Sequence, residues 1–258
     1  MNRFSRYWTA FQTIFTKEFL RFIRIWKQTV LPPVITTILY FIIFGNLIGK
    51  RIGEMDGFRY IDFIVPGLIL MAVITNSYAN VVSSFFSSKF QRHIEELLIS
   101  PVPNWVILAG YVGGGVSRGL IVGVTVTAVS LLFTDINIHS YSWTLMVVVL
   151  TSVLFALAGF INAIYANSFD DISIIPTFVL TPLTYLGGVF YSIRMLPEFW
   201  QQVSMVNPVL YMVNAFRYGL LGVSDISISA ALGIILLFII SLIGFSLYLL
   251  RKGVGIKN

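Results

Sequence analysis

Long apolar stretches alternate with short polar segments along most of the chain. Six of the stretches approach or exceed the roughly twenty residues that a helix needs to cross a hydrocarbon core of about 30 Å, and they contain almost no charge. They cover residues 28–49, 60–86, 105–133, 143–165, 172–191 and 226–250. The pattern predicts an all-α membrane protein with six transmembrane helices in residues 28–250, within a single domain over residues 1–258.

Residues 1–27 show a different pattern, in which aromatic residues recur at steps of three and four. The stripe consists of Phe4, Trp8, Phe11, Phe15, Phe19, Phe22 and Trp26, and the other face carries Arg6, Lys17, Arg21 and Arg24. Charges of this kind are costly in hydrocarbon but favourable at the headgroups. We therefore expect residues 1–27 to form an amphipathic helix in the plane of the membrane surface. An ordinary core-facing helix is the alternative.

Residues 194–222 are apolar but are interrupted by prolines, amides and charged residues. These interruptions oppose free insertion of a lipid-exposed span, because unpaired backbone groups are costly in lipid. The segment is predicted to form a re-entrant pair of half-helices before the last span, with a seventh span as the alternative.

The composition supports a membrane protein and excludes a soluble enzyme of ordinary type. Hydrophobic residues make up 57% of the chain and charged residues 11%, and the mean hydropathy is +0.87. The formal charge of +6 comes from Lys and Arg that flank the apolar stretches, which indicates membrane anchors and no nucleic-acid partner. Their concentration before residue 28, near residue 90 and after residue 250 predicts that both termini are cytoplasmic.

Motifs for catalysis are missing from the sequence. Gly45 to Arg51 resembles a phosphate loop but has the wrong glycine spacing, and Gly115 to Gly119 matches a nucleophile elbow inside an apolar helix. His93 and His139 are predicted on opposite sides of the membrane, so no metal site is expected. Asp170 and Asp171 fit a helix cap better than an acid–base pair. We expect no enzyme activity and no cofactor bound by this chain.

Arg118 lies deep within the third predicted span. A charge there should face other helices or water, and should pair with carbonyls or with an acid such as Asp62. Charged residues inside the membrane are candidates for function, although a purely structural arginine is an equal alternative.

Several short motifs occur in a fixed order along the chain. They are Arg24-Ile25-Trp26, Leu31-Pro32-Pro33, Phe63-Ile64-Val65-Pro66-Gly67, Phe90-Gln91-Arg92 with Glu95-Glu96-Leu97-Leu98 and Ser100-Pro101, Thr177-Phe178-Val179-Leu180-Thr181-Pro182-Leu183, and Asn207-Pro208 with Arg217-Tyr218-Gly219. In their order and spacing, and over essentially the whole length, the chain resembles the permease subunits of ABC type-2 exporters, in particular the YadH-like inner membrane transport permeases.

The resemblance implies a homodimeric permease in a bacterial inner membrane, bound to two copies of a separate ATPase subunit that carries ATP and Mg. It also implies that residues 87–100 form a cytoplasmic coupling helix on the ATPase, with a solvated loop as the alternative. The coupling residues would be Lys89, Gln91, Arg92, Glu95, Glu96, Leu97, Leu98 and Pro101.

By the same resemblance, the first, second and fifth spans line the translocation path and the half-helices form its outer gate. The expected path residues are Tyr40, Phe41, Phe63, Arg118, Thr181 and Tyr185, and the expected gate residues are Asn207, Pro208 and Arg217. Because this lining is mostly apolar or aromatic, an amphipathic or lipid-linked substrate or drug is favoured. An ion-coupled secondary transporter and a non-transporting membrane regulator coupled to an ATPase are the alternatives.

Overall fold

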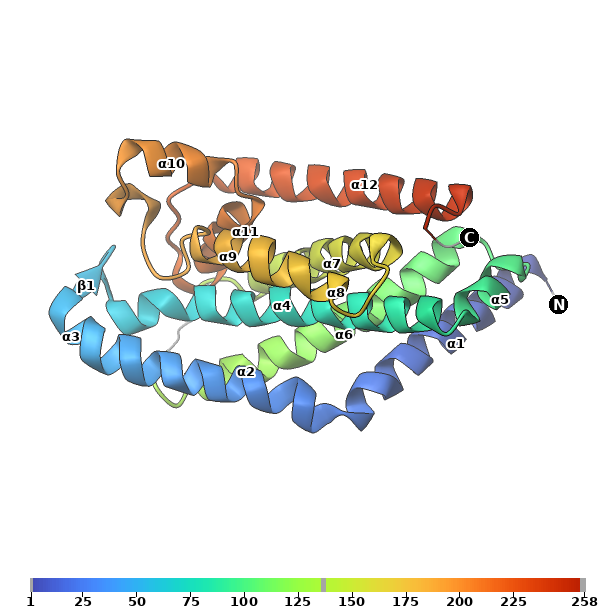
Figure 1. Cartoon of the computed structure of the whole chain (residues 1–258). Coiled ribbons are helices and arrows are strands. Elements are labelled where there is room, and N and C mark those ends of the chain that lie inside the picture. The colour runs from blue at the N-terminus through green and yellow to red at the C-terminus, as the bar shows by residue number, and fades with distance from the viewer. Residues whose placement is uncertain (1, 136–137, 256–258) are drawn as a thin grey trace.

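The computed structural model describes residues 2–135 and 138–255, which form a bundle of helices running side by side (Figure 1). The helices from the amino-terminal half are α1 (Arg3–Arg24), α2 (Trp26–Tyr40), η1 (Phe41–Ile48), α3 (Gly49–Ile52), α4 (Tyr60–Phe90), α5 (His93–Ile99) and α6 (Asn104–Ser130). Those of the second half are α7 (Tyr141–Tyr165), α8 (Asp171–Ile175), η2 (Pro176–Leu180), α9 (Thr181–Tyr185), η3 (Ile193–Met195), α10 (Glu198–Met205), α11 (Pro208–Leu221) and α12 (Ile228–Lys252).

The transmembrane prediction is confirmed for five spans. Within residues 2–135 and 138–255, five helices are long and apolar enough to cross a membrane, namely α4, α6, α7, α12 and the segment Trp26–Gly45 that contains α2. This finding makes the chain a multi-pass membrane protein, whereas the count of six spans stays a prediction.

The predicted fifth span is shorter than expected. Its helix runs without a break through α8, η2 and α9 and ends at Tyr185, not at Tyr191. At 1.5 Å per residue this helix is only about 22 Å long, less than the thickness of a hydrocarbon core. Gly187 and Gly188 follow directly, and Gly188 has a φ of +72°, which a helix does not accommodate. The glycine pair therefore ends the helix early.

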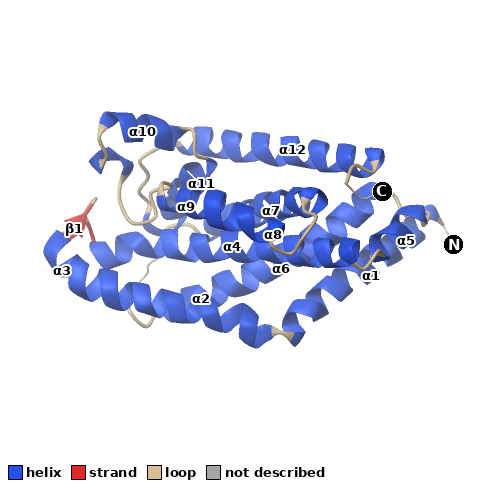
Figure 2. Cartoon of the chain, viewed as in Figure 1, coloured by secondary structure: helices blue, strands red, loops and turns tan. Residues whose placement is uncertain are grey.

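The sequence predicts an all-α protein, but the structure also contains a small β-hairpin. Strands β1 (Glu54–Met55) and β2 (Phe58–Arg59) pair antiparallel, and Figure 2 shows this hairpin beside α3. The turn residues Asp56 and Gly57 have φ values of 51° and 81°, the left-handed conformation that two-residue hairpin turns favour. A polar Asp-Gly pair in the loop after the first span therefore produces a short hairpin.

Helix α4 forms the centre of the bundle. It packs against α6, α7 and α11 (Figure 1), and 72% of its most apolar window is buried, against 17% in the window that contains α2. Large side chains such as Phe63, Phe85 and Tyr78 are fully enclosed along its length. Side chains from several other helices therefore meet on α4, which makes it the scaffold of the candidate site.

Helix α6 approaches its neighbours through glycines, as its four-residue spacing of small residues predicts. A Cβ on Gly110 would lie 2.5 Å from Ile14 Cγ2, and a Cβ on Gly114 would lie 2.5 Å from Glu18 Cβ. Both contacts are with α1. Glycine at these positions lets the two helices pack closely and brings polar side chains of α1 into the bundle.

Helix α1 confirms the predicted amphipathic helix, and the rings of Trp8, Phe11, Phe15 and Phe19 stack in succession along it. Trp8 is exposed, whereas Ile14, Glu18 and Phe22, which are four residues apart, are buried against the bundle. The face of α1 that packs on the bundle therefore lies at one edge of the aromatic stripe. A position in the plane of the membrane surface stays a prediction.

The segment 194–222 forms two short helices, α10 and α11, as predicted. Helix α10 is largely exposed, and α11 is buried between α4, α7 and α12. Gly222 ends α11 with a φ of +77°. Whether the pair re-enters the membrane from one side stays a prediction.

Asp171 helps to cap the fifth helix, as expected, but Asp170 does not. Ser168 Oγ accepts a hydrogen bond from the Asp171 amide, and Asp171 Oδ2 accepts from the amides of Asn167 (2.8 Å) and Ser168 (3.1 Å). This reciprocal arrangement is a capping box. The hydrogen bonds, first that from Asn167, hold the pKa of the Asp171 carboxyl below its ordinary value.

Different helices and strands lie at the two ends of the bundle. Helix α5, the beginning of α1 and the end of α12 lie at one end, while α3, β1 and α10 lie at the other (Figure 1). The first and last helices therefore meet the predicted coupling segment at the same end. This arrangement agrees with the predicted placement of both termini on one side of the membrane, although it does not identify that side.

Candidate functional site

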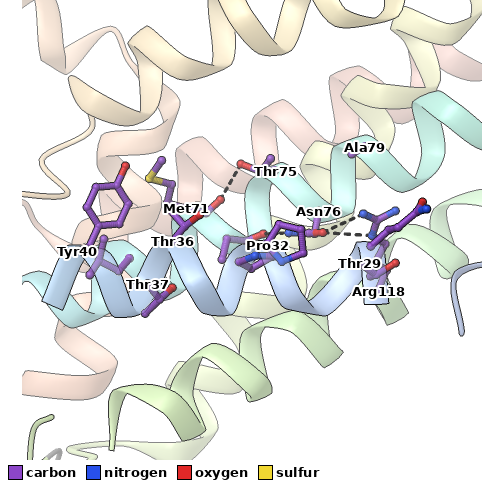
Figure 3. A pocket seen from close by; sticks show the side chains of 14 residues that line it. Thr29, Pro32, Thr36, Thr37, Tyr40, Met71, Thr75, Asn76, Ala79 and Arg118 are labelled. Atoms are coloured by element: carbon purple, nitrogen blue, oxygen red, sulfur yellow. Dashed lines mark hydrogen bonds between the residues drawn. The ribbon is translucent and has the colours of Figure 1, made fainter. Parts of the chain in front are cut away.

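A cavity of about 310 Å³ lies between α2 and α4, and α6 contributes Arg118 to it (Figure 3). Its walls combine hydroxyl groups with apolar surface, represented by Thr29, Pro32, Thr36, Met71 and Ala72. Tyr40 lies toward one end, and Arg118 and Asn76 lie toward the other (Figure 3). The cavity is within the size range of small-molecule sites and has both a polar and an apolar part.

Arg118 is partly buried and is held by an amide. Its Nε and Nη2 atoms donate hydrogen bonds of 3.2 and 3.0 Å to Asn76 Oδ1. The expected pairing with Asp62 is wrong, because Asp62, in the first turn of α4, accepts a 2.7 Å hydrogen bond from Arg59 at the end of β2. Within the described residues, no carboxylate lies within 4.0 Å of the Arg118 guanidinium.

Asn76 begins a row of polar residues at four-residue intervals along α4. We call this row the α4 polar stripe, and it consists of Asn76, Asn80, Ser84 and Ser88. Arg21 Nη2 donates to the Asn80 carbonyl (2.8 Å) and to Asn80 Oδ1 (2.9 Å), and Ser84 Oγ donates to Glu18 Oε1 (2.6 Å). Arg21 and Glu18 also form an ion pair at 3.5 Å. The stripe thus binds charged side chains of α1 inside the bundle.

The last member of the stripe connects α4 to two more helices. Ser88 Oγ accepts a hydrogen bond from the Tyr111 hydroxyl (3.1 Å) on α6 and a longer one from Lys17 Nζ (3.5 Å) on α1. Sequence reasoning missed Glu18, Arg21 and the stripe itself. The signal was present, because four polar residues four apart in an apolar span must share one helix face.

The expected path residues fall into two groups. Tyr40 and Tyr185 meet, with their hydroxyl oxygens 3.3 Å apart, and they share an aromatic cluster with Phe44 and Phe190. Thr181 is exposed on the same helix as Tyr185 and donates to the Pro176 carbonyl. Of the expected set, the structure places Arg118 and Tyr40 on the cavity, and Tyr185 beside Tyr40.

Phe41 and Phe63 do not line the cavity. Both are fully buried in the core, where Phe41 stacks on Phe133 with ring centroids 5.1 Å apart. Phe63 lies under the Arg217 guanidinium, whose central carbon is 4.0 Å from the ring centroid. Both side chains face the core of the bundle, and a role in the translocation path stays a prediction.

Arg217 is fully buried at the end of the bundle near α3 and α10. Its Nη2 donates a 2.5 Å hydrogen bond to the Gly188 carbonyl, and its Nη1 lies 4.0 Å from Asp225 Oδ2. Asp225 also accepts from the Ser192 hydroxyl (2.9 Å) and the Ile193 amide (3.2 Å). Arg217 and Asp225 therefore join α11 to the chain that follows the fifth helix.

Asn207 and Pro208 begin α11. The Asn207 side chain accepts from the Val209 amide (2.9 Å) and donates to the Leu183 carbonyl (2.6 Å) on α9. Pro208 occupies the first turn, where its missing amide costs little. Asn207 and Arg217 thus anchor the segment 194–222 to the fifth helix and to the loop that follows it, and the gate role of the three residues stays a prediction.

The expected coupling segment is the end of α4 together with α5. The two helices are joined at Arg92, which has a φ of 61°. Ile94 is buried and holds α5 on the bundle, while Gln91, Arg92, Glu95, Glu96 and Pro101 are exposed and Leu97 and Leu98 are half-buried. Most of the expected coupling residues are therefore accessible to a partner.

Lys89 is the exception among them. Its Nζ donates to the carbonyls of Ile164 (2.6 Å) and Ala166 (2.7 Å) at the end of α7. A lysine there satisfies carbonyls that have no partner within their own helix. Lys89 thus faces the bundle and joins α4 to α7.

These features define a multi-pass helical membrane protein of the transport permease class, with a cavity between two spans and an exposed helical segment at one end. Residues 9–221 match the ABC-2 type transporter family, and the chain belongs to that family. Family members work in general with an ABC ATPase.

Similar proteins confirm the resemblance seen in the motifs. The chain is 58% identical to the inner membrane transport permease YadH of Escherichia coli (strain K12), over 98% of both chains. It is 22% identical to nodulation protein J of Rhizobium leguminosarum bv. viciae, over 88% of this chain and 90% of that one. Nodulation protein J of Rhizobium meliloti (strain 1021) is 23% identical, over 88% of both chains. A role as a transport permease follows.

Proposed function

We propose that this chain is the membrane subunit of an ATP-driven exporter in a bacterial inner membrane. Two copies of the chain would assemble with two copies of a separate ATPase subunit that binds ATP and Mg. The assembly would move an amphipathic or lipid-linked substrate or drug out of the cytoplasm or the inner leaflet. Both termini and α5 would lie on the cytoplasmic side.

The observation that carries this proposal is the continuity of α4. The helix borders the cavity between Leu68 and Ala79 and then runs on to Phe90, where the exposed coupling segment begins. From Asn76 to Phe90 the helix rises about 21 Å. A force applied by a partner at α5 would therefore reach the cavity through one rigid, buried helix.

The surface of the coupling segment supports a docking role. Phe90 is 62% exposed and Ile99 is 86% exposed, and the charged residues Arg92, Glu95 and Glu96 lie between them in the sequence. Large apolar side chains beside charges are typical of a contact surface between proteins. An ATPase that grips this surface would move α4 when ATP closes it.

The aromatic cluster supports alternating access. Tyr40 belongs to α2 and Tyr185 to α9, and their contact lies beside the end of the cavity that is opposite Arg118. In the proposed topology that end faces outward. Outward opening would separate the two tyrosines, which would break the hydrogen bond between their hydroxyl groups and the packing of both rings on Phe190.

An ion-coupled transporter is the second candidate, because Glu18 places a buried carboxylate between α1 and α4. Glu18 of α1 is fully buried and accepts a hydrogen bond from Ser84 of the α4 polar stripe. Its two carboxylate oxygens already contact Arg21 (3.5 Å) and the Ser84 hydroxyl (2.6 Å), so a coupling ion would have to displace a partner that the protein supplies. The exporter is therefore the better proposal.

Co-purification tests the ATPase partnership. Tagged protein from native membranes is expected to retain an ABC ATPase, and the double variant Glu95→Lys with Glu96→Lys is expected to reduce the retained amount at least tenfold. The reason is that two exposed charges on the docking surface change sign, which imposes like-charge costs at the contact. Retained ATPase is measured by quantitative mass spectrometry.

A matched double variant serves as the control. Glu54→Lys with Glu198→Lys makes the same charge change on exposed residues at the opposite end of the bundle. This variant is expected to retain the ATPase as the unmodified protein does. Full retention of the ATPase by the Glu95 and Glu96 variant would refute a role of the coupling segment in ATPase binding. Loss of the ATPase from both variants would show that the charge changes do not act through the coupling segment alone, and would refute the placement of the docking surface at α5.

A further inference from the structure

We propose that the Arg118 end of the cavity binds the acid group of an anionic amphiphile, such as a phosphate or a carboxylate. The apolar part of the amphiphile would lie along Pro32, Met71 and Ala72 toward Tyr40. The proposal rests on the proposed function, since it names the class of substrate that the same cavity would take.

The charge balance around the cavity favours an anion. Two guanidinium groups are held by neighbouring members of the α4 polar stripe, Arg118 by Asn76 and Arg21 by Asn80. Arg21 has an acidic partner in Glu18, at 3.5 Å. Arg118 has no carboxylate within 4.0 Å among residues 2–135 and 138–255. The pair of arginines is thus left with one uncompensated positive charge.

The hydrogen bonds of Arg118 leave donors for a ligand. Nε and Nη2 both donate to the single oxygen Asn76 Oδ1, whereas Nη1 has no hydrogen-bond partner in the described part of the chain. Asn76 is itself fixed, because its Nδ2 donates to the Ala72 carbonyl at 3.0 Å. An amide that positions a guanidinium without neutralising it leaves the cation ready for an oxyanion.

The rest of the cavity fits the neutral part of an amphiphile. Pro32 and Pro33 lie inside α2 and line the cavity, and they deprive the carbonyls of Gln28 and Thr29 of their helical amide donors. These acceptors near the Arg118 end suit hydroxyl groups close to the acid. The remaining wall combines the apolar side chains of Leu68 and Met71 with the hydroxyl groups of threonines such as Thr36. A charged head and an apolar tail therefore both find matching surfaces.

Binding of dodecyl phosphate tests the proposal. The purified full-length chain in phosphatidylcholine nanodiscs is titrated with dodecyl phosphate, and with dodecanol as the uncharged analogue, by isothermal titration calorimetry. Dodecyl phosphate is expected to bind at least tenfold more tightly than dodecanol. Arg118→Gln is expected to weaken dodecyl phosphate binding by about tenfold to hundredfold, because a charge-assisted pair is lost.

A second variant neutralises the positive charge of Arg118 without removing the arginine. Asn76→Asp places a carboxylate where Asn76 Oδ1 holds Arg118, so Arg118 stays in position but is neutralised. This variant is expected to lose dodecyl phosphate binding to the same degree as Arg118→Gln while it unfolds at a similar temperature to the unmodified chain. Arg51→Gln, an exposed residue of α3, is the matched control and is expected to bind normally.

The same titration in phosphatidylglycerol nanodiscs shows whether the acid group comes from a membrane lipid or from another amphiphile. Weaker dodecyl phosphate binding there would identify a lipid headgroup as the competing occupant, and unchanged binding would identify an amphiphile other than the bulk lipid; both results support an anion site. Equal affinity of Arg118→Gln, of Asn76→Asp and of the unmodified chain would overturn the proposal, as would equal binding of dodecanol.

These measurements need no ATPase, so the two proposals fail separately. Loss of ATPase association with intact, Arg118-dependent binding would refute the exporter alone. Normal ATPase association with binding that ignores Arg118 would refute the anion site alone.

Discussion

Arg217 and Arg118 are both buried or partly buried arginines beside α4, but their surroundings differ. Arg217 is fully enclosed, lies over the Phe63 ring, donates to a backbone carbonyl and faces Asp225. Arg118 borders a cavity and is held only by the Asn76 amide among the described residues. One charge is compensated by the protein, and the other is not.

The difference separates a structural arginine from a binding one. A buried ion pair is hard to disrupt, because removal of one partner leaves the other charged and without a counterion. An arginine that faces a cavity with an amide partner leaves no such charge behind. The comparison therefore predicts that the two arginines contribute very differently to stability.

Arg217→Leu is expected to have the largest effect. The substitution removes a fully buried cation from beside Asp225, which then keeps only its 3.4 Å ion pair with the exposed Arg194, and it leaves the Gly188 carbonyl without a donor. The loss should be about 3 to 5 kcal/mol. The measurement is the thermal unfolding midpoint in detergent, together with the yield of folded protein. Arg217→Lys keeps the charge, so its loss of stability should be smaller. Equal losses of stability for Arg217→Leu and Arg217→Lys would contradict the structural role of the Arg217 charge.

Gly114→Ala is expected to have an intermediate effect on the region around Arg118. The added Cβ would lie 2.5 Å from Glu18 Cβ, so α1 must move away from α6 and from the α4 polar stripe. Overpacking of this kind costs about 1 to 3 kcal/mol. Gly233→Ala on α12, where a Cβ meets nothing within 4 Å, is the control. A normal unfolding midpoint for Gly114→Ala would show that α1 is loosely attached.

Arg118→Leu is expected to have the smallest effect on stability. Asn76 keeps its own hydrogen bond to the Ala72 carbonyl, so the loss should stay below about 1 kcal/mol, while transport is strongly impaired. The unfolding midpoint and ATPase stimulation by substrate are measured together. Destabilisation as large as that of Arg217→Leu would erase the contrast between the two arginines and return Arg118 to a structural role.

The long helices could be predicted from the sequence, because a long apolar stretch is enough to indicate a membrane-spanning helix. Charge-free stretches of sufficient length gave five spans close to their observed bounds. The fifth helix was predicted to reach Tyr191, because the stretch stays apolar, but Gly187 and Gly188 end it. The backbone conformation of two glycines outweighed hydropathy there, and a window of hydropathy does not register it.

The partners of the charged residues could not be predicted in the same way. Asp62 was the nearest acid to expect for Arg118, yet a local contact with Arg59 satisfies it. Glu18 belongs to a helix that the sequence places at the membrane surface, and its burial depends on the space left by Gly114 on α6. Such contacts depend on which helices are neighbours, which hydrophobic periodicity does not determine. The coupling and gate roles themselves came from the family resemblance and stay proposals.

The hydrogen bonds of Lys89 have a mechanical consequence. The ammonium group fastens the last turn of α4 to the carbonyl end of α7, so the coupling segment is attached to two spans at once. A push on α5 would be shared between them, and the two would tilt as one body. Because α4 also packs against α7 along its length, Lys89 extends this contact to the end of the bundle where a partner subunit would push.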